Sequence, residues 1–357
     1  MRGIVFDGHH LQLTDALSVR EPRAGEVKVR VLRSGLCHSD LNMVSSTFIQ
    51  TPVVLGHEAA GEVVALGPGV GDFALGERVI AGTQAPCGTC RECRRGTPAN
   101  CDTTWGMPAQ QPFLWQGRPT YSFANVSSFA AEIVVRASQL FRIEDLPPEQ
   151  AALIGCAVST GYAAAQVLGQ VGIGDRVAVI GVGGIGVNAI TGARLAGAEV
   201  LAVDINPRKE EAARLAGARQ FLVCQRDTDG ATTAEAMRQA FAPIDVSIEC
   251  SGVSAAADAA IAAVKRGGRV VLIGQGKPGC RISVSLDDVT MGREIIGQLN
   301  GGAKPERDYP KLIALARSGQ IDLAAQVTHV WPVTEFEKAI TALRAGEVTR
   351  AVLDHTV

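Results

Sequence analysis

The sequence has almost no net charge and no long uninterrupted apolar run. Its 357 residues carry a formal net charge of −2 at pH 7, which gives no electrostatic reason to expect a nucleic acid or an anionic membrane as partner. One apolar stretch, residues 177–193, falls short of the roughly 20 residues that cross a bilayer. It contains five glycines and is flanked by Asp175, Arg176 and Arg194. A buried strand followed by a helix explains it better than a membrane span.

The N-terminal stretch MRGIVFDGHHLQLTD also lacks the apolar core of a signal peptide. We therefore expect a protein that is not exported and stays in the cytoplasm, where thiols remain reduced. The length suggests two domains, at roughly 100–200 residues each. Glycine, by contrast, is abundant at 40 residues, which fits many tight turns better than a helical bundle.

Four of the nine cysteines lie within fifteen residues, in CGTCRECRRGTPANC (87–101). The spacing Cys87-x2-Cys90-x2-Cys93-x7-Cys101 lets four thiolates surround one zinc ion tetrahedrally and leaves no position for water, as in structural sites. A reducing compartment disfavours disulfides. An iron–sulfur cluster is the alternative, because cysteine number alone does not separate the two. We predict a structural zinc that shapes the loop and does no chemistry itself.

Three other segments carry candidate metal ligands beside glycine: GLCHSD, LGHEAAGEVV and IGCAVSTGY. Their ligands, Cys37, His57 and Cys156, would together hold a zinc ion with an open fourth position, and two cysteines with one histidine are a known catalytic set. Such a zinc is a Lewis acid that polarises a hydroxyl or carbonyl. Each residue alone is more often structural, and spacing along the chain does not by itself bring the three together.

A glycine motif lies where a short buried strand, 177–180, meets a helix expected over 188–196. The motif is formed by Gly181, Gly183, Gly184 and Gly186, and Asp204 ends the next strand about 20 residues further on. Gly181 supplies the tight turn, Gly183 lets a pyrophosphate approach the backbone at a helix N-terminus, and Gly186 allows close packing. The context predicts a dinucleotide site rather than a glycine-rich turn without a ligand.

The choice of dinucleotide depends on the residues after the second strand. Asp204 can accept hydrogen bonds from a ribose diol and would repel a 2′-phosphate, which favours NAD. Arg208 and Lys209 keep NADP as an alternative.

Strands and helices alternate beyond the glycine motif, with strands expected in 245–252 and 268–274 and helices in 209–218 and 254–264. This alternation predicts a doubly wound parallel sheet. Before about residue 150, short runs with strand-like alternation are broken by Gly and Pro, which predicts a mostly β unit.

Taken together, these motifs resemble the zinc-dependent medium-chain alcohol dehydrogenases over nearly the full length. The stretches GLCHSD, LGHEAAGEV, CGTCRECRRG, IGCAVSTGY, GVGGIG, VDINPRK, THVWPV and AGEVTRAVL follow the family's order. The resemblance implies an α/β fold in which a Rossmann domain, residues 158–299, is inserted into a mostly β GroES-like catalytic domain, residues 1–157 and 300–357. It also implies two zinc ions per chain, NAD, a small alcohol or aldehyde substrate, and a homodimer, with a tetramer as the alternative.

The resemblance assigns roles to residues around the catalytic zinc. Cys37, His57 and Cys156 match its ligands, and Glu58 matches a carboxylate that can approach the metal. Asp40 matches the acid that orients the ligand histidine, and Ser39 matches the hydroxyl that takes the alcohol's proton toward the cofactor ribose. Hydride would then pass to the nicotinamide.

The same resemblance also implies contacts with the cofactor. His38 and Arg350 match cationic contacts to the pyrophosphate, Thr160 and Ile185 match residues behind the nicotinamide, and Lys209 matches a contact beside Asp204.

The sequence departs from the family in two places. Asn42 stands near the position of the histidine that ends the proton relay, and an amide is no base, so the proton would leave through water. Trp105 and Trp115, in the segment 102–126, either shape the substrate entrance or pack. The second departure is in the expected substrate pocket, where Thr83 and Gln275 stand at positions that are often bulky and apolar in the family, whereas Phe123 and Leu299 keep the apolar character.

These features predict oxidation of primary alcohols, aromatic or terpenoid ones among them, to aldehydes with NAD, or the reverse reduction. One alternative is glutathione-dependent formaldehyde oxidation, although the residues after Cys101 offer Asp102 rather than an arginine for the glutathione carboxylates. Another keeps the nicotinamide bound and passes electrons to a different carrier. A non-catalytic dinucleotide-binding protein is disfavoured because all three open-site ligands are present. The other cysteines, Cys224, Cys250 and Cys280, are expected to be packed thiols.

Overall fold

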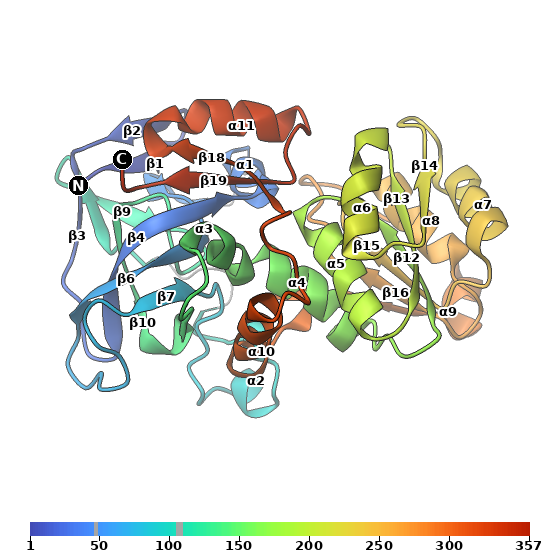
Figure 1. The fold of residues 1–357 in the computed structure, drawn as a ribbon, viewed down its shortest axis with the longest axis horizontal. Helices are drawn as coiled ribbons and strands as arrows, with labels where there is room; N and C mark the ends of the chain where they lie inside the picture. Colours follow the sequence, from blue (N-terminus) through green and yellow to red (C-terminus); the bar gives the residue numbers. More distant parts are fainter. Residues whose placement is uncertain (46–48, 105–109) are drawn as a thin grey trace. The chain divides into compact units, whose positions relative to one another are not determined.

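The computed structural model describes residues 1–45, 49–104 and 110–357, and Trp105 lies outside them. The chain divides into two compact units, Met1–Cys156 with Lys304–Val357 (unit 1) and Ala157–Ala303 (unit 2). Figure 1 traces both along the chain. The sequence placed the return to the first domain at residue 300. In the structure, residues 300–303 belong to unit 2, because Gly301 and Gly302 pack against Thr160 and Leu168 of that unit.

Unit 1 is built mainly from two sheets. The smaller has the strand order β2-β1-β5-β9-β8-β3. Its strands are β1 (Gly3–Phe6), β2 (Leu11–Thr14), β3 (Leu17–Val19), β5 (Val53–Val54), β8 (Phe113–Trp115) and β9 (Arg118–Ser122).

The larger sheet has the order β11-β7-β6-β4-β19-β18, and β10 also pairs with β4. Its strands are β4 (Glu26–Leu36), β6 (Glu58–Leu66), β7 (Arg78–Ala81), β10 (Glu132–Arg136), β11 (Leu140–Arg142), β18 (Val327–Pro332) and β19 (Arg350–Asp354). The strand-like runs expected before residue 150 therefore include β4 and β6, the longest strands of this sheet, and the shorter β10.

Short helices surround these sheets, and α11 lies along β18 and β19 (Figure 1). The chain ends also meet in this unit, where the Arg2 Nη1 donates to the Val357 carbonyl at 3.0 Å. The α-helices are α1 (His38–Val44), α2 (Arg91–Arg94), α3 (Pro148–Ala151), α10 (Pro305–Arg317) and α11 (Phe336–Arg344). The 3₁₀ turns are η1 (Pro98–Asn100), η2 (Ala137–Gln139), η3 (Ala152–Gly155) and η7 (Val333–Glu335).

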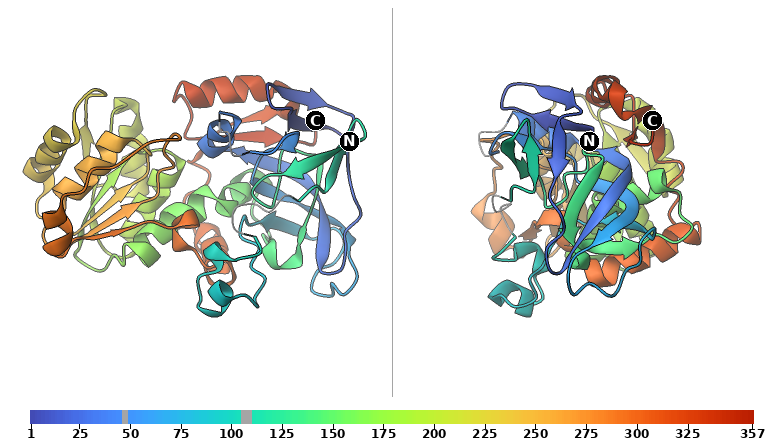
Figure 2. Two further views of the ribbon diagram at one scale, coloured as in Figure 1. Left: turned by 180° about the vertical axis from the view of Figure 1, so that it is seen from behind. Right: turned by 90° about the vertical axis from the view of Figure 1, so that its left-hand side faces the viewer.

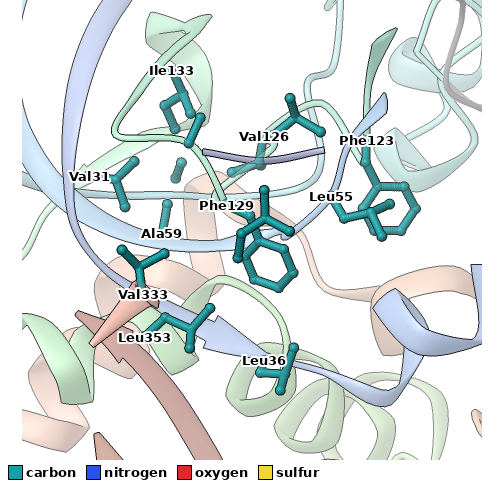
Figure 3. Close-up of a cluster of buried hydrophobic side chains, with 14 of the residues drawn as sticks. Val31, Leu36, Leu55, Ala59, Phe123, Val126, Phe129, Ile133, Val333 and Leu353 are labelled. Carbon is teal, nitrogen blue, oxygen red and sulfur yellow. The ribbon is translucent and has the colours of Figure 1, made fainter. Parts of the chain in front are cut away.

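One apolar core joins the two sheets of unit 1. Figure 3 shows Val31 and Ala59 from the larger sheet with Phe129, Val333 and Leu353. Trp115 is 5 % exposed and belongs to the same core, so it packs, as one of its two expected roles requires. The core fixes the strands whose ends carry the candidate ligands.

Unit 2 is a six-stranded parallel sheet in the order β14-β13-β12-β15-β16-β17. Numbered along the chain this is 3-2-1-4-5-6, the order of a doubly wound dinucleotide fold. The strands are β12 (Arg176–Ile180), β13 (Glu199–Asp204), β14 (Gln220–Val223), β15 (Val246–Glu249), β16 (Arg269–Leu272) and β17 (Glu294–Ile296).

Helices cover both faces of this sheet (Figures 1 and 2). Val177 and Val179 of β12 contact the cluster that includes α5 and α6, whereas Ala178 and Ile180 contact the cluster that includes α7 and α8. The alternation explains why this strand reads as a continuous apolar run. The helices are α4 (Ala157–Ala163), α5 (Gly184–Leu195), α6 (Glu210–Ala216), α7 (Gly230–Phe241), α8 (Ser254–Ala263) and α9 (Leu286–Thr290), with a π-helical turn η4 (Ala164–Leu168) and 3₁₀ turns η5 (Pro207–Lys209) and η6 (Leu299–Gly302).

One helix start differs from the prediction. The helix expected over 188–196 begins at Gly184, inside the glycine motif, with Gly183 as its N-cap. Glycine lowers helix propensity, but the close packing of Gly186 against the Gly181 carbonyl offsets that preference.

Within the described residues no single helix has both the length and the apolarity to span a membrane, although the bent pair Pro148–Gly155 and Ala157–Leu168 passes by length and composition.

Candidate active site and metal centres

The strand pairing of the larger sheet gathers the candidate ligands at one end. β4 and β6 are antiparallel, with Gly35 opposite Glu58, so the end of β4 lies beside the start of β6. Cys37 follows the first strand and His57 precedes the second. β7 pairs with β6 on the other side, and the Gly155 backbone lies against the end of β7. Cys156 follows Gly155 directly.

These residues form a cluster with the composition of a zinc site. The two Cys Sγ atoms, one His57 ring nitrogen and one Glu58 carboxylate oxygen all lie within 4.8 Å of one another. Cys37 and His57 are buried, and Cys156 is partly exposed. Two thiolates and one imidazole fit zinc, and both are donors this ion prefers.

Asp40 fixes the orientation of His57. Its Oδ1 lies 3.0 Å from the His57 Nδ1 and accepts from the Gly56 backbone N–H at 3.1 Å, while its Oδ2 accepts from the Cys37 N–H at 3.0 Å. With Nδ1 as donor to this carboxylate, the Nε2 lone pair is left for a metal. The buried aspartate thus holds two of the three ligand residues.

The Ser39 side chain lies beside the His57 Nε2, the nitrogen left for a metal. Its Oγ is 3.3 Å from the His57 Nε2, and it stands on the first turn of α1, two residues after Cys37. A substrate oxygen at the metal would lie close to this hydroxyl. Asn42 follows on the same helix, half-buried.

Glu58 does not stand free beside the cluster, because its carboxylate is paired with the buried guanidinium of Arg350. The pairing follows from topology, since β19 runs antiparallel to β4 with Ala351 opposite Leu36. Gly35 leaves the necessary room: a Cβ there would lie 1.9 Å from the Glu58 Oε2. Burial raises the pKa of Glu58, and the Arg350 charge opposes that rise.

The pKa values of the two thiols in this cluster are shifted in opposite directions. The hydrogen bond from Cys156 lowers the pKa of Cys37 well below its ordinary value, and the same bond raises the pKa of Cys156. Burial alone would lower the pKa of His57, but the neighbouring Asp40 carboxylate raises it well above its usual value. The pocket therefore stabilises a thiolate at Cys37 beside a His57 ring that Asp40 orients.

Phe123 forms one wall of this site, with its ring edge-to-face to the His57 ring at a centroid distance of 5.6 Å. Thr83 is half-buried, and its backbone carbonyl accepts from the Asn125 side chain at 3.0 Å. Gln275 and Leu299 belong to unit 2 and are exposed there.

The four-cysteine loop closes into a second cluster. The four Sγ atoms lie within 4.8 Å of one another. Backbone N–H groups of Cys87, Cys90 and Cys93 point at sulfurs, at 3.3–3.4 Å. Gly88 and Gly96 adopt positive φ values of 74° and 78°, which the tight loop requires. Burial alone would raise the pKa of Cys101, but hydrogen bonds from Thr103 and Thr104 lower it to about 5.

In unit 2 the glycine motif has the form that a pyrophosphate needs. Gly181 has a φ of 90°, and a Cβ on Gly186 would lie 1.9 Å from the Gly181 carbonyl oxygen. A Cβ on Gly183 would meet no atom within 4 Å, so the space beside its backbone is open at the N-terminus of α5. The Ile185 carbonyl lies against Gly161, the residue that follows Thr160.

Asp204 ends β13 beside this turn. Its Oδ2 accepts from the Val182 N–H at 2.7 Å and its Oδ1 from the Asn206 N–H at 2.8 Å, so its carboxylate is fixed at the motif. Burial lowers the pKa of the nearby Lys209, and the Asp204 charge opposes this. His38, expected at the pyrophosphate, is exposed on α1 of unit 1.

Some residues around the sites carry no sequence signal of a role. Gly35, Gln139 and Tyr309 are examples, and only their contacts in the structure reveal them.

The expectation that Cys280 is a packed thiol is wrong. It is exposed, 2.9 Å from the Ser254 hydroxyl, because it lies in the loop after β16 rather than under a helix.

A cluster of Cys37, His57, Glu58 and Cys156 that fits zinc in one unit, and a dinucleotide turn in the other, are together typical of a zinc-binding oxidoreductase. Residues 23–145 match the family profile described as alcohol dehydrogenase GroES-like domain, and residues 184–318 match zinc-binding dehydrogenase. The chain is 34% identical over 360 residues to the S-(hydroxymethyl)glutathione dehydrogenase of Synechocystis sp., covering 98% of this chain and 97% of that protein. It is 32% identical to the NDMA-dependent alcohol dehydrogenase of Amycolatopsis methanolica, covering 96% and 95%.

Solved structures of alcohol dehydrogenases are similar to this chain over nearly its full length. The benzyl alcohol dehydrogenase from Acinetobacter calcoaceticus has a TM-score of 0.88 at 25% identity, covering 99% of this chain and 98% of that one. An alcohol dehydrogenase zinc-binding domain protein from Burkholderia ambifaria has a TM-score of 0.90 at 27% identity, with the same coverage. The chain belongs to the zinc-dependent medium-chain alcohol dehydrogenase family, with its GroES-like and Rossmann folds. Zinc fits both cysteine-containing clusters, and NAD is typical of the family.

Proposed function

We propose that the protein is an NAD-dependent zinc alcohol dehydrogenase that interconverts primary alcohols, aromatic and terpenoid ones among them, and their aldehydes. The supporting observation is the convergence of Cys37, His57 and Cys156, with the Ser39 hydroxyl beside the His57 Nε2. A zinc ion held there would supply a Lewis acid for the substrate oxygen. NAD, held at the glycine motif, would supply the hydride acceptor.

The chain's own residues would prepare the site for that chemistry. Asp40 holds the His57 ring in one tautomer, and Ser39 takes the proton of the substrate hydroxyl. Asn42, on the same helix, carries an amide that cannot act as a base, so the proton taken up by Ser39 would leave through water. Phe123 excludes water on one side of the imidazole and favours an apolar substrate.

The test is a panel of primary alcohols assayed with NAD and NADP in parallel, on enzyme whose zinc content has been measured. We expect benzylic and other apolar primary alcohols to be oxidised with NAD, and two zinc ions per chain. No oxidation of any alcohol by zinc-loaded enzyme would overturn the proposal.

A second candidate is S-(hydroxymethyl)glutathione oxidation, which the name of a relative 34% identical to this chain favours. It needs cations for the glutathione carboxylates, and Asp102, directly after the four-cysteine loop, is an anion. Rates with S-(hydroxymethyl)glutathione and with benzyl alcohol, measured on one enzyme preparation, distinguish these two activities.

A third alternative is an enzyme that keeps its nicotinamide bound and passes electrons to another carrier. Turnover with an artificial electron acceptor and no added NAD would reveal it.

We also propose a homodimer, with a tetramer as the alternative, and a cytoplasmic location, because thiolate ligands need reduced cysteines. Support for self-association comes from the edge strand β17, which carries the exposed Ile296, and from the exposed side chains of Leu286, Val289 and Met291 in the segment just before it. Light scattering on the purified chain measures the state.

Replacing Ser39 with Ala is expected to lower kcat by about 10²–10⁴-fold, the usual contribution of a positioned proton-transfer group. Zinc content and the KM for NAD should not change, because Ser39 is not a ligand. Ser45→Ala, at the exposed C-cap of the same helix, is the matched control. Equal kcat values for Ser39→Ala and the unmodified enzyme would remove Ser39 from the relay.

Replacing Asp204 with Asn is expected to reduce kcat/KM with NAD about 10-fold and to raise the NADP-to-NAD ratio by about 10–100-fold. The amide retains an acceptor but no longer repels a 2′-phosphate. Steady-state kinetics with both cofactors measure the ratio, and Asp227→Asn, on an exposed loop of the same unit, is the control. An unchanged ratio would mean that Asp204 does not select the cofactor.

A further inference from the structure

Cys156 is the one ligand of the open site whose backbone the Asp40 carboxylate does not help to hold. Asp40 accepts from the Cys37 and Gly56 N–H groups and binds the His57 ring, and it lies on α1, directly after β4. Cys156 instead follows a 3₁₀ turn, η3, with φ −141° and ψ −74°, and its N–H donates to the Leu153 carbonyl at a long 3.4 Å. Something else must fix this turn if the third thiolate is to reach the metal.

One contact that fixes it comes from Tyr309 in α10, 154 residues after Gly155. The Tyr309 hydroxyl donates to the Gly155 carbonyl oxygen at 3.0 Å, one residue before the ligand. Tyr309 is fully buried, so water does not compete for this carbonyl. The bond restrains the peptide unit that carries the Cys156 backbone nitrogen.

The ring of Tyr309 is itself held in place. A Cβ on Gly82 would lie 2.5 Å from its Cε2, so only glycine at that position leaves room for the ring. Phe141 packs edge-to-face against it, at a centroid distance of 4.7 Å. Gln139 fixes Gly82 in turn. Its side-chain amide donates to the Gly82 carbonyl at 2.8 Å, and its backbone carbonyl accepts from the Gly82 N–H at 2.8 Å.

The other side of the turn is closed by β7. A Cβ on Gly155 would lie 2.8 Å from the Ala81 carbonyl oxygen, so the Gly155 backbone lies directly against the end of that strand. The start of α10 is also fixed, because the buried Asp308 accepts from the Lys304 N–H at 2.7 Å. Gly155 is therefore held between the strand end and the tyrosine hydroxyl.

From this geometry we propose that Tyr309 is a positioning residue of the open zinc site, which sets the reach of Cys156 through its hydrogen bond to the Gly155 carbonyl. The proposal rests on the zinc site of the proposed function. Groups that orient metal ligands typically change metal affinity by about 10–100-fold when they are lost. The four-cysteine site, whose loop lies elsewhere in unit 1, provides an internal reference.

The experiment follows zinc release from the full-length protein under a chelator, for the unmodified chain and for Tyr309→Phe, which keeps the ring and removes only the hydroxyl. We expect two ions per chain in both. In Tyr309→Phe one ion should leave about 10-fold faster or more, and the other should leave at the unmodified rate. Added zinc should restore kcat in the variant, with the KM for NAD unchanged. Tyr121→Phe, in β9 of the same unit, is the matched control.

The possible outcomes distinguish the proposal for Tyr309 from the proposed function. If the unmodified chain holds only one ion, the open site fails, and the proposal for Tyr309 fails with it. If it holds two and Tyr309→Phe releases neither faster, or both faster together with a lower melting temperature, Tyr309 has no positioning role while the proposed function stands.

Discussion

Replacing Cys156 with Ala is expected to reduce the zinc content from two ions per chain to one and to lower kcat/KM for alcohols by about 10³–10⁴-fold, because the Lewis acid supplies several kcal/mol to the transition state. Glu58 lies in the same cluster, but it does not replace the lost thiolate, since its carboxylate is paired with the buried Arg350. Cys156 is partly exposed, so its truncation leaves little cavity and the melting temperature should change little.

Metal analysis, steady-state kinetics and thermal unfolding of the same preparation test this prediction. Cys224→Ala is the matched control, because Cys224 is a half-buried cysteine of unit 2 that belongs to neither cluster. Retention of two ions together with full activity in Cys156→Ala would exclude the open site. Loss of the ion with undiminished activity would instead separate the reaction from the metal.

Replacing Cys101 with Ala is expected to act on stability rather than on the chemical step. Cys101 is fully buried, and its sulfur accepts from the Cys87 N–H at 3.4 Å, so its loss opens the four-thiolate cluster and the loop that surrounds it. Structural zinc sites contribute directly to folding. We expect unit 1 to lose at least about 3 kcal/mol, which corresponds to a melting temperature lower by about 6–12 °C for a unit of this size.

Calorimetry and zinc analysis measure both effects, and enzyme assayed well below the new melting temperature should keep most of its kcat. Cys280→Ala is the control, since that thiol is exposed and belongs to unit 2. A Cys101→Ala protein with two zinc ions, or with an unchanged melting temperature, would contradict a structural metal site in this loop.

The two predictions rest on sites that the sequence specified to different degrees. The four cysteines of residues 87–101 are joined by short loops, and Gly88 and Gly96 make the turns, so local chain geometry is sufficient to close the cluster. The glycine motif is equally local: its strand, turn and helix occupy one continuous segment, and only the start of α5, at Gly184 rather than 188, differs. Both could be predicted because few distant contacts are needed to form them.

The open site is different, because its ligands are separated by up to about 120 residues. They were proposed from their residue types and matched by the family resemblance, but their spacing could not show that they meet. Antiparallel pairing of β4 with β6 and of β19 with β4 brings Cys37, His57 and Arg350 to one end of a sheet. The ion pair between Glu58 and Arg350, 292 residues apart, could not be read from either segment. The sequence suggested that Arg350 contacts the cofactor, and this stays a prediction beside the observed pairing.

What the sequence alone determined is therefore the set of chemical groups and the local turns: the thiols, the imidazole, the glycine backbone at Gly181–Gly186 and the carboxylate of Asp204. Only the tertiary structure decided which of these groups meet, that Asp40 orients His57, and that Tyr309 reaches the Gly155 carbonyl next to a ligand. The physical reason is that local geometry follows from the preferences of adjacent residues. Contacts between distant segments form only when strand pairing and core packing offset the chain entropy that ordering them costs.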